Sequence, residues 1–245
     1  VSYTPKVKAG DFNGDGLADL AAAGNSQIAI FSGDGHGNFS QSTLLPVDGL
    51  ITALAAGSSD RLNGSSKLAA GISGPNGPGI LVIAEEEKQF FSSSATVSGL
   101  SSGQFSASGS SDIIATAGSE LIVINSKNAV TRSQLNFHAS SPILGKFNND
   151  RALQLAVLDS EGNIRIIPGS GRSSQTSRDG SNNGELILAS LPGAAQIAVA
   201  RLSSTGYDDI VATDRLNSRV SIVSFDGTSS VAHLDTGSSR LLNAT

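Results

Sequence analysis

Residues 11–24 read DFNGDGLADLAAAG, a loop rich in acidic residues followed by a run of small apolar side chains. The apolar run at 19–24 has relatives at 67–71, 112–117, 154–157 and 209–213. The first hydrophobic residues of these five runs, the anchors, lie 48, 45, 42 and 55 positions apart: Leu20, Leu68, Ile113, Leu155 and Ile210. A unit of about 45 residues that recurs in this way indicates a repeat architecture.

Each repeat contains the same succession of short strands separated by turn residues. A strand of small apolar residues precedes the anchor, and a β-branched strand follows it, at 27–31, 80–83, 121–124, 164–167 and 220–223. A more polar fourth strand then follows, as at 38–45 and 185–188. Four short antiparallel strands per repeat predict the blade of an all-β propeller. A β-sandwich is the alternative, because it also uses many short strands, but its strands do not recur as a four-strand unit.

The repeats predict a single propeller domain over residues 1–245, with about five units visible at 7–50, 51–98, 99–141, 142–193 and 194–237. Residues 238–245 are expected to begin a further blade, and residues 2–4 to be the outer strand of a last blade. These ends do not close a five-bladed ring neatly, so we expect part of a six- or seven-bladed ring, or an unusual closure. The chain starts at Val1 and contains no Met, which favours a mature or excised piece of a longer precursor.

The composition excludes several classes of function. The net charge is −5 and no basic block occurs, so nucleic acid is not an expected partner. No apolar run of about 18 residues exists, so no membrane insertion is expected. The absence of Cys rules out disulfides, thiolate catalysis and Cys-ligated zinc. Asn-x-Ser/Thr sequons at Asn38, Asn63 and Asn243 matter only in a host that glycosylates them.

Residues 9–20, AGDFNGDGLADL, resemble the calcium loop of FG-GAP and VCBS-type repeats, and so does the hairpin at 31–39, FSGDGHGNF. The resemblance is close over 7–45, whereas the other four repeats share the strand pattern and have lost most of the loop. Repeats of this kind build the propellers of integrin alpha subunits and of many secreted bacterial proteins. The resemblance implies a secreted, non-catalytic β-propeller for adhesion, recognition or extracellular assembly.

The loop carries oxygen-bearing side chains at alternate positions, as a calcium site requires. Calcium takes about six to eight oxygen ligands in a flexible cage. We predict a Ca²⁺ ion held by the side chains of Asp11, Asn13, Asp15 and Asp19 and by the backbone carbonyl of Leu17. Gly16 permits the sharp turn, and a cation offsets the repulsion among three carboxylates. The alternative is a set of Asx turns that reverse the chain without a metal.

The other four repeats have lost this donor set. The equivalent positions are found by counting back from each anchor. They are Ser59, Arg61, Asn63 and Lys67 in the second repeat and Gln104, Ser106, Ser108 and Asp112 in the third. In the fourth repeat they are Lys146, Asn148, Asp150 and Gln154, and in the fifth Arg201, Ser203, Thr205 and Asp209. Lys or Arg supplies positive charge in three of them, and the third repeat keeps one carboxylate. We therefore predict no metal in the second to fifth repeats.

Three further features of the sequence are candidate functional sites. Residues 99–103, GLSSG, fit the G-x-S-x-G pattern of serine hydrolases, but that chemistry needs a strand–elbow–helix context, so we predict no catalysis there. His36, His138 and His233 are isolated and are expected to be surface or packing residues. The polar segment 168–184 is expected to be a mobile loop, in which Arg172 and Arg178 offer a ligand or partner contact.

The leading hypothesis is a secreted, calcium-binding, non-enzymatic propeller. Its expected partner is a protein or a glycan on a cell surface or matrix, or another copy of the chain. A lectin is the second hypothesis, although the chain has no Trp and only Tyr3 and Tyr207 as tyrosines. Part of a carbohydrate-active enzyme and the repeating subunit of an extracellular filament are the remaining alternatives.

Overall fold

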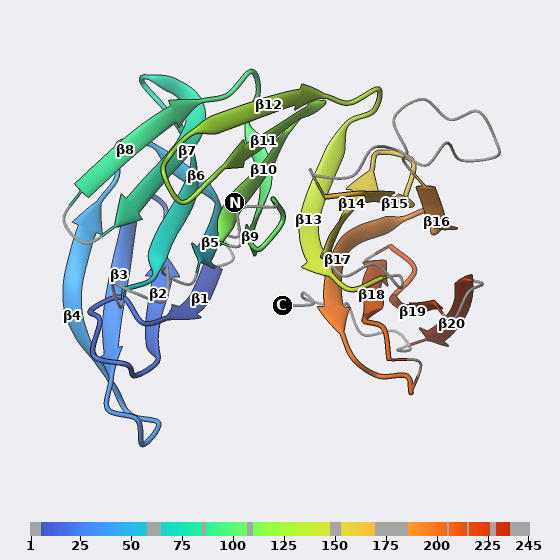
Figure 1. Cartoon of the computed structure of the whole chain (residues 1–245), viewed down its shortest axis with the longest axis horizontal. Coiled ribbons are helices and arrows are strands. Elements are labelled where there is room, and N and C mark those ends of the chain that lie inside the picture. The colour runs from blue at the N-terminus through green and yellow to red at the C-terminus, as the bar shows by residue number, and fades with distance from the viewer. Residues whose placement is uncertain are drawn as a thin grey trace. The chain divides into compact units, whose positions relative to one another are not determined.

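The structure is a computed structural model that describes residues 6–57, 65–84, 87–106, 110–147, 153–169, 186–204, 206–214, 216–225 and 229–235. These residues form twenty strands in five antiparallel four-stranded sheets, and the strands of each sheet lie side by side in chain order (Figure 1). The predicted all-β class is confirmed. The described residues contain no helix that is long and apolar enough to cross a membrane.

The first of two compact units lies within Val1–Gly103 and Ser110–Asn136 and holds three sheets. Sheet 1 comprises β1 (Lys6–Gly10), β2 (Asp19–Ala23), β3 (Gln27–Gly33) and β4 (Phe39–Pro46). Sheet 2 comprises β5 (Leu50–Gly57), β6 (Lys67–Gly74), β7 (Gly77–Ala84) and β8 (Glu87–Ser92). Sheet 3 comprises β9 (Val97–Gly103), β10 (Asp112–Ala117), β11 (Glu120–Ile124) and β12 (Val130–Gln134).

The second unit lies within Gln104–Gly109 and Phe137–Thr245 and holds two sheets. Sheet 4 comprises β13 (Ala139–Gly145), β14 (Gln154–Asp159), β15 (Asn163–Ile167) and β16 (Leu186–Ser190). Sheet 5 comprises β17 (Ala194–Ala200), β18 (Asp209–Asp214), β19 (Arg219–Phe225) and β20 (Ser229–Asp235).

Within each unit the sheets pack face to face, and the alternation of side chains along a strand decides which residue faces which neighbour. The anchors Leu68, Ile113 and Ile210 face the sheet that precedes them in the chain. The residue after the anchor faces the following sheet, as Ala21 and Ala156 do. Both faces of a central strand are therefore apolar, which explains the nearly continuous hydrophobic runs of the sequence.

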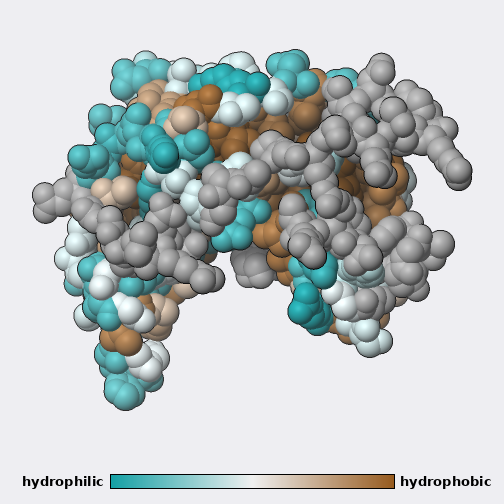
Figure 2. Space-filling model, viewed as in Figure 1, coloured by the Kyte–Doolittle hydropathy of each residue, from teal (hydrophilic) through white to brown (hydrophobic). Residues whose placement is uncertain are grey.

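In sheets 1, 2 and 3 the fourth strand is the most exposed of the four. All five residues of β12 are exposed, and seven of the eight residues of β4 are. The tip of the β3–β4 hairpin is hydrophilic, as the lower end of the molecule in Figure 2 shows. Polar residues are tolerated here because no neighbouring sheet covers them, as the polar character of these segments predicted.

Candidate metal-binding loop and its counterparts

The loop between β1 and β2 is closed by its own side chains. Asp11 accepts hydrogen bonds from the backbone N–H of Gly14 at 2.7 Å and of Gly16 at 2.9 Å, one on each carboxylate oxygen. Asn13 Oδ1 accepts from the N–H of Asp15 at 2.9 Å, and Asp15 Oδ1 accepts from the N–H of Leu17 at 2.8 Å. The two glycines have φ angles of 79° and 84°, a region that favours glycine, and this allows the tight turns.

Asp19 lies apart from this exposed group, at the start of β2, where it is fully buried. Its Oδ2 accepts from the N–H of Phe12 at 2.8 Å, and its Oδ1 accepts from the N–H of Gly33 at 3.0 Å. One carboxylate thus ties the end of β3 to the chain that leaves β1. A buried polar group is tolerated when it is paired in this way.

The same interaction recurs in the second unit. Gln154 Oε1 accepts from the N–H of Phe147 at 2.8 Å, and Asp209 Oδ2 accepts from the N–H of Leu202 at 2.6 Å. In each case the donor is an apolar residue seven positions before the acceptor. We call this arrangement the seven-residue clasp; its acceptors are Asp19, Gln154 and Asp209. Since Gln154 is neutral, the clasp in these three sheets requires a hydrogen-bond acceptor rather than a charge, whereas sheet 2 has Lys67 at this position, which donates instead.

A glycine two positions before the aromatic donor completes the clasp in sheets 1 and 4. A Cβ atom on Gly10 would lie 2.9 Å from Cζ of Phe12, and one on Gly145 would lie 2.5 Å from Cζ of Phe147. The ring of Phe147 is only 2% exposed. This pattern was not predicted, although the sequence shows Gly-x-Phe followed by Asp or Gln seven residues after the aromatic at 10–19, 103–112 and 145–154.

The predicted calcium ligands can now be placed. Asn13, Asp15 and Leu17 are exposed and Asp11 is half-buried, whereas Asp19 is buried. Asn13 Nδ2 also donates to Asp15 Oδ2 at 2.9 Å. Across the ranges that the structure describes, no group of three or more Asp, Glu or His side chains converges closely enough to hold a metal ion. The donor chemistry of Asp11, Asn13 and Asp15 fits a hard cation, because each carboxylate oxygen has two lone pairs and accepts one hydrogen bond from the loop.

The corresponding positions of the other repeats hold different contacts. Lys67 Nζ donates to the carbonyl of Ser126 at 2.7 Å and to Asn128 Oδ1 at 3.2 Å. Arg201 pairs with Asp208 at 3.1 Å. Ser59, Arg61, Asn63, Ser108, Asn148, Asp150 and Thr205 lie outside the described residues, as do Arg172, Arg178 and Asn243.

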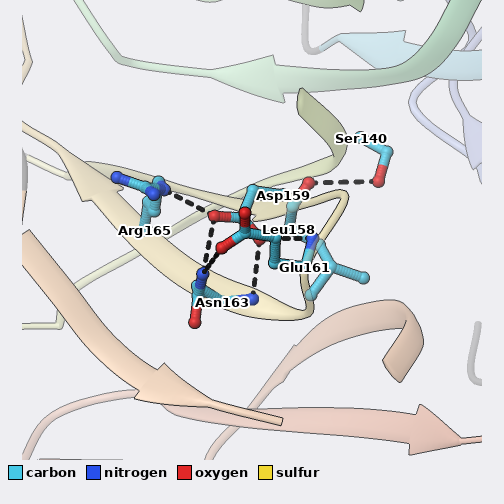
Figure 3. A network of polar contacts seen from close by, with 6 residues as sticks. All are labelled: Ser140, Leu158, Asp159, Glu161, Asn163 and Arg165. Atoms are coloured by element: carbon cyan, nitrogen blue, oxygen red, sulfur yellow. Dashed lines mark hydrogen bonds and ion pairs between the residues drawn. The ribbon is translucent and has the colours of Figure 1, made fainter. Parts of the chain in front are cut away.

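A second recurring feature is an aspartate that closes a hairpin. Asp34, Asp159 and Asp214 each accept from two backbone N–H groups of the turn and from an Asn amide, that of Asn38, Asn163 or Asn217. Figure 3 shows this network at Asp159, to which Arg165 also donates at 2.7 Å. Burial opposes ionisation of Asp159, but hydrogen bonds from Asn163 and Arg165 outweigh it, and its pKa lies below the ordinary value.

The structure also places the other candidates from the sequence, the GLSSG segment and the three histidines. The GLSSG segment lies within strand β9 instead of an elbow before a helix. His36, His138 and His233 are exposed, and His233 Nδ1 lies 2.8 Å from Ser221 Oγ.

Comparison with known proteins adds to this description. Residues 11–60 match the family described as the FG-GAP-like repeat. No curated protein matches the sequence. Among solved structures, the fold is similar to BBS1N in complex with ARL6DN, soaked with lead, with a TM-score of 0.65, 16% identity and coverage of 96% of this chain and 67% of that chain. The same complex soaked with mercury gives a TM-score of 0.59, 16% identity and coverage of 92% and 66%.

This chain therefore spans about two thirds of the length of those solved chains. The protein has a β-propeller-type fold in which each four-stranded sheet is one blade. Its first repeat, with the loop described above, lies largely within the stretch that matches the FG-GAP-like repeat, as the resemblance predicted.

The clasp predicts that Asp19 contributes more to stability than Asp15. We expect Asp19→Ala to lower the free energy of unfolding by roughly 2–5 kcal/mol, because it leaves two partly buried N–H groups without an acceptor. Asp15→Ala, measured without calcium, should cost only about 0.5–1.5 kcal/mol, since its partners can turn to water. Urea denaturation of both variants in chelator measures the difference. Equal losses would contradict the clasp.

The clasp also predicts a dependence on pH. Burial raises the pKa of Asp209, but hydrogen bonds from Ser224, Ser203 and Leu202 outweigh it and lower the pKa overall. The resulting stability is present above the ordinary Asp pKa of about 3.9 and is lost as the pH falls through the lowered value. Melting temperatures measured from pH 7 downwards should fall below about pH 5.

Asp209→Asn should lower the melting temperature at pH 7 and make its fall in acid shallower. The matched control is Gln154→Asn at the same position of sheet 4, where no titratable group is lost. That variant should keep the wild-type acid slope. An unchanged slope for Asp209→Asn would refute the assignment.

Proposed function

We propose that the chain is a non-catalytic propeller that binds a protein partner, and that a calcium ion in the 11–19 loop stabilises its first blade. The fold supports the first part of this proposal, the binding of a protein partner. Propellers present many loops on a rigid frame of sheets, a geometry suited to recognition. A solved protein of similar fold, BBS1N, is in complex with the protein ARL6DN.

The 11–19 loop supports the second part of the proposal, the binding of a calcium ion. Asp11, Asn13 and Asp15 would hold the ion through side-chain oxygens, with Leu17 adding a backbone carbonyl. Calcium supplies positive charge beside carboxylates that otherwise repel one another. The residues of this chain already form the loop through hydrogen bonds from Gly14, Gly16 and Leu17, so the ion would meet a partly ordered site. Asp19 would contribute mainly by fixing the end of the loop through the clasp.

We infer an extracellular location from the chemistry that such a site would have. Loops of this kind in extracellular modules bind calcium with a Kd of about 10⁻⁴–10⁻³ M. They are filled only where free calcium is millimolar, which favours a secreted or surface-attached protein. The partner would then be a protein on a cell surface or matrix. The net charge of −5 leaves nucleic acid as a poor candidate.

Calcium should stabilise the protein measurably. At about 10 mM Ca²⁺ the expected gain is roughly 1.4–2.7 kcal/mol for that range of Kd, or a rise in melting temperature of about 3–10 °C. Asp15→Ala should abolish the rise, while Asp48→Ala, an exposed aspartate after β4, should keep it. Magnesium at the same concentration controls for ionic strength. A melting curve that calcium does not move would refute the metal site.

The partner can be tested separately on cells of the organism that makes the protein. A fluorescent form of the chain should bind saturably, and brief protease treatment of the cells should remove the binding. Periodate oxidation of surface glycans should leave it unchanged. The opposite pattern would favour a lectin, and the absence of saturable binding would contradict surface recognition altogether.

A further inference from the structure

One face of sheet 1 is apolar and only partly covered. Strand pairing places six apolar side chains on this face: Val7, Leu20, Ala22, Ala29, Phe31 and Leu44. Val7 and Leu44 are exposed, and the other four are half-buried. None of the six belongs to a hydrophobic core cluster of the described residues. We call these six residues the open face of sheet 1. A contiguous exposed apolar surface of this kind marks an interaction site.

Other sheets of the chain bury the same positions. Counted from the anchors through the strand registers, Val7 corresponds to Leu54 in sheet 2 and to Ile197 in sheet 5. Val7 is 50% exposed, whereas Leu54 and Ile197 are 4% and 5% exposed because a preceding sheet covers them. The anchor and the residue paired with it on the third strand are likewise half-buried in sheet 1 and buried in sheets 2 and 5. The open face of sheet 1 therefore has the composition of a buried interface between blades.

Sheet 5 carries the opposite kind of face. The side that in other sheets packs against a following sheet holds five apolar residues: Ala198, Val211, Val220, Ile222 and Leu234. The first four are half-buried, Leu234 is 56% exposed, and none of the five belongs to a core cluster of the described residues. Val211 and Ile222 correspond to Ala21 and Ile30 of sheet 1, which are buried against sheet 2. We call these five residues the open face of sheet 5.

The two open faces correspond to the two halves of one blade interface. In sheets 1 and 2, Ala21 and Ile30 pack in one core cluster with the anchor Leu68. In sheets 4 and 5, Ala156 packs in the same way with the anchor Ile210. Sheet 5 offers the first half of this arrangement and sheet 1 offers the second. A second copy of the chain thus presents the apolar surface that the open face of sheet 1 fits, and removing both faces from water favours the contact.

We propose that the open face of sheet 1 in one copy packs against the open face of sheet 5 in a second copy, so that the chains associate head to tail. The two partners use different surfaces, so the contact is heterologous, and such contacts continue into rings or open filaments. This association goes beyond the function proposed above. It does not require the calcium ion, because neither open face includes a residue of the 11–17 loop.

Analytical ultracentrifugation of the full chain in chelator tests this proposal. The mass of the wild type should rise with concentration and pass beyond that of a dimer. Val7→Glu and Leu234→Glu each place a charge in the contact and should weaken association about tenfold or more. Both residues are at least half exposed in a single copy, so the melting temperature should change little. Leu216→Glu is the matched control, because it makes the same exchange at an 88% exposed residue between β18 and β19, and it should associate as the wild type does.

An equimolar mixture of the two variants makes the test specific. Val7→Glu keeps the open face of sheet 5 and Leu234→Glu keeps that of sheet 1, so together they should form a 1:1 dimer that grows no further. Leu44→Glu, on the same face, replaces Val7→Glu if that variant does not fold. A wild type that stays monomeric at its highest soluble concentration would overturn the proposal. A mixture that does not dimerise, or variants that associate alone as the wild type does, would do the same. Failure of calcium binding would leave these results unchanged, because they are obtained in chelator.

Discussion

The seven-residue clasp fixes the path of the chain from the first strand to the second in sheets 1, 4 and 5. In each of these sheets the second residue of the loop after the first strand has a partly or fully buried backbone N–H, which requires an acceptor. Asp19, Gln154 and Asp209 meet this requirement by accepting from the N–H of Phe12, Phe147 and Leu202. The acceptor opens the second strand, so the same bond that closes the loop also sets where the strand begins.

Much of the fold follows from the sequence because the pattern is repeated. One run of small apolar residues is ambiguous, but five runs that start at Leu20, Leu68, Ile113, Leu155 and Ile210 with similar strands around them predict a blade architecture. The division of each strand between two neighbouring sheets was also predictable, since alternating side chains of a buried strand must face both ways.

The roles of individual polar residues were less predictable, because an acidic loop looks the same in a sequence whether its side chains bind a cation or cap backbone N–H groups. Asp19 illustrates this point. Spacing grouped it with Asp11, Asn13 and Asp15, whereas the structure buries it and gives each of its oxygens an N–H partner. The neutral Gln154 at the same position was the available clue, because a side chain chosen for its charge would not be replaced by an amide.

Ion pairs between neighbouring strands are harder to predict from the sequence, because they depend on the register of strand pairing. Glu120 pairs with Arg132 in sheet 3 at 2.6 Å, and Asp159 pairs with Arg165 in sheet 4 at 2.7 Å. These residues are 12 and 6 positions apart, and only the strand pairing brings each pair together.

The clasp finally limits what a cation can do for this fold. Because Phe12 and Gly33 hold Asp19 without a metal, the start of β2 and the end of β3 are fixed by the protein alone. A bound ion would act on residues 11–17, which hold the proposed ligands, and its effect would be local. The same logic explains how Gln154 can open the second strand of its blade without a carboxylate. The scaffold and the proposed ion site are therefore separable, and a repeat can lose the acidic residues of its loop while it keeps its strands.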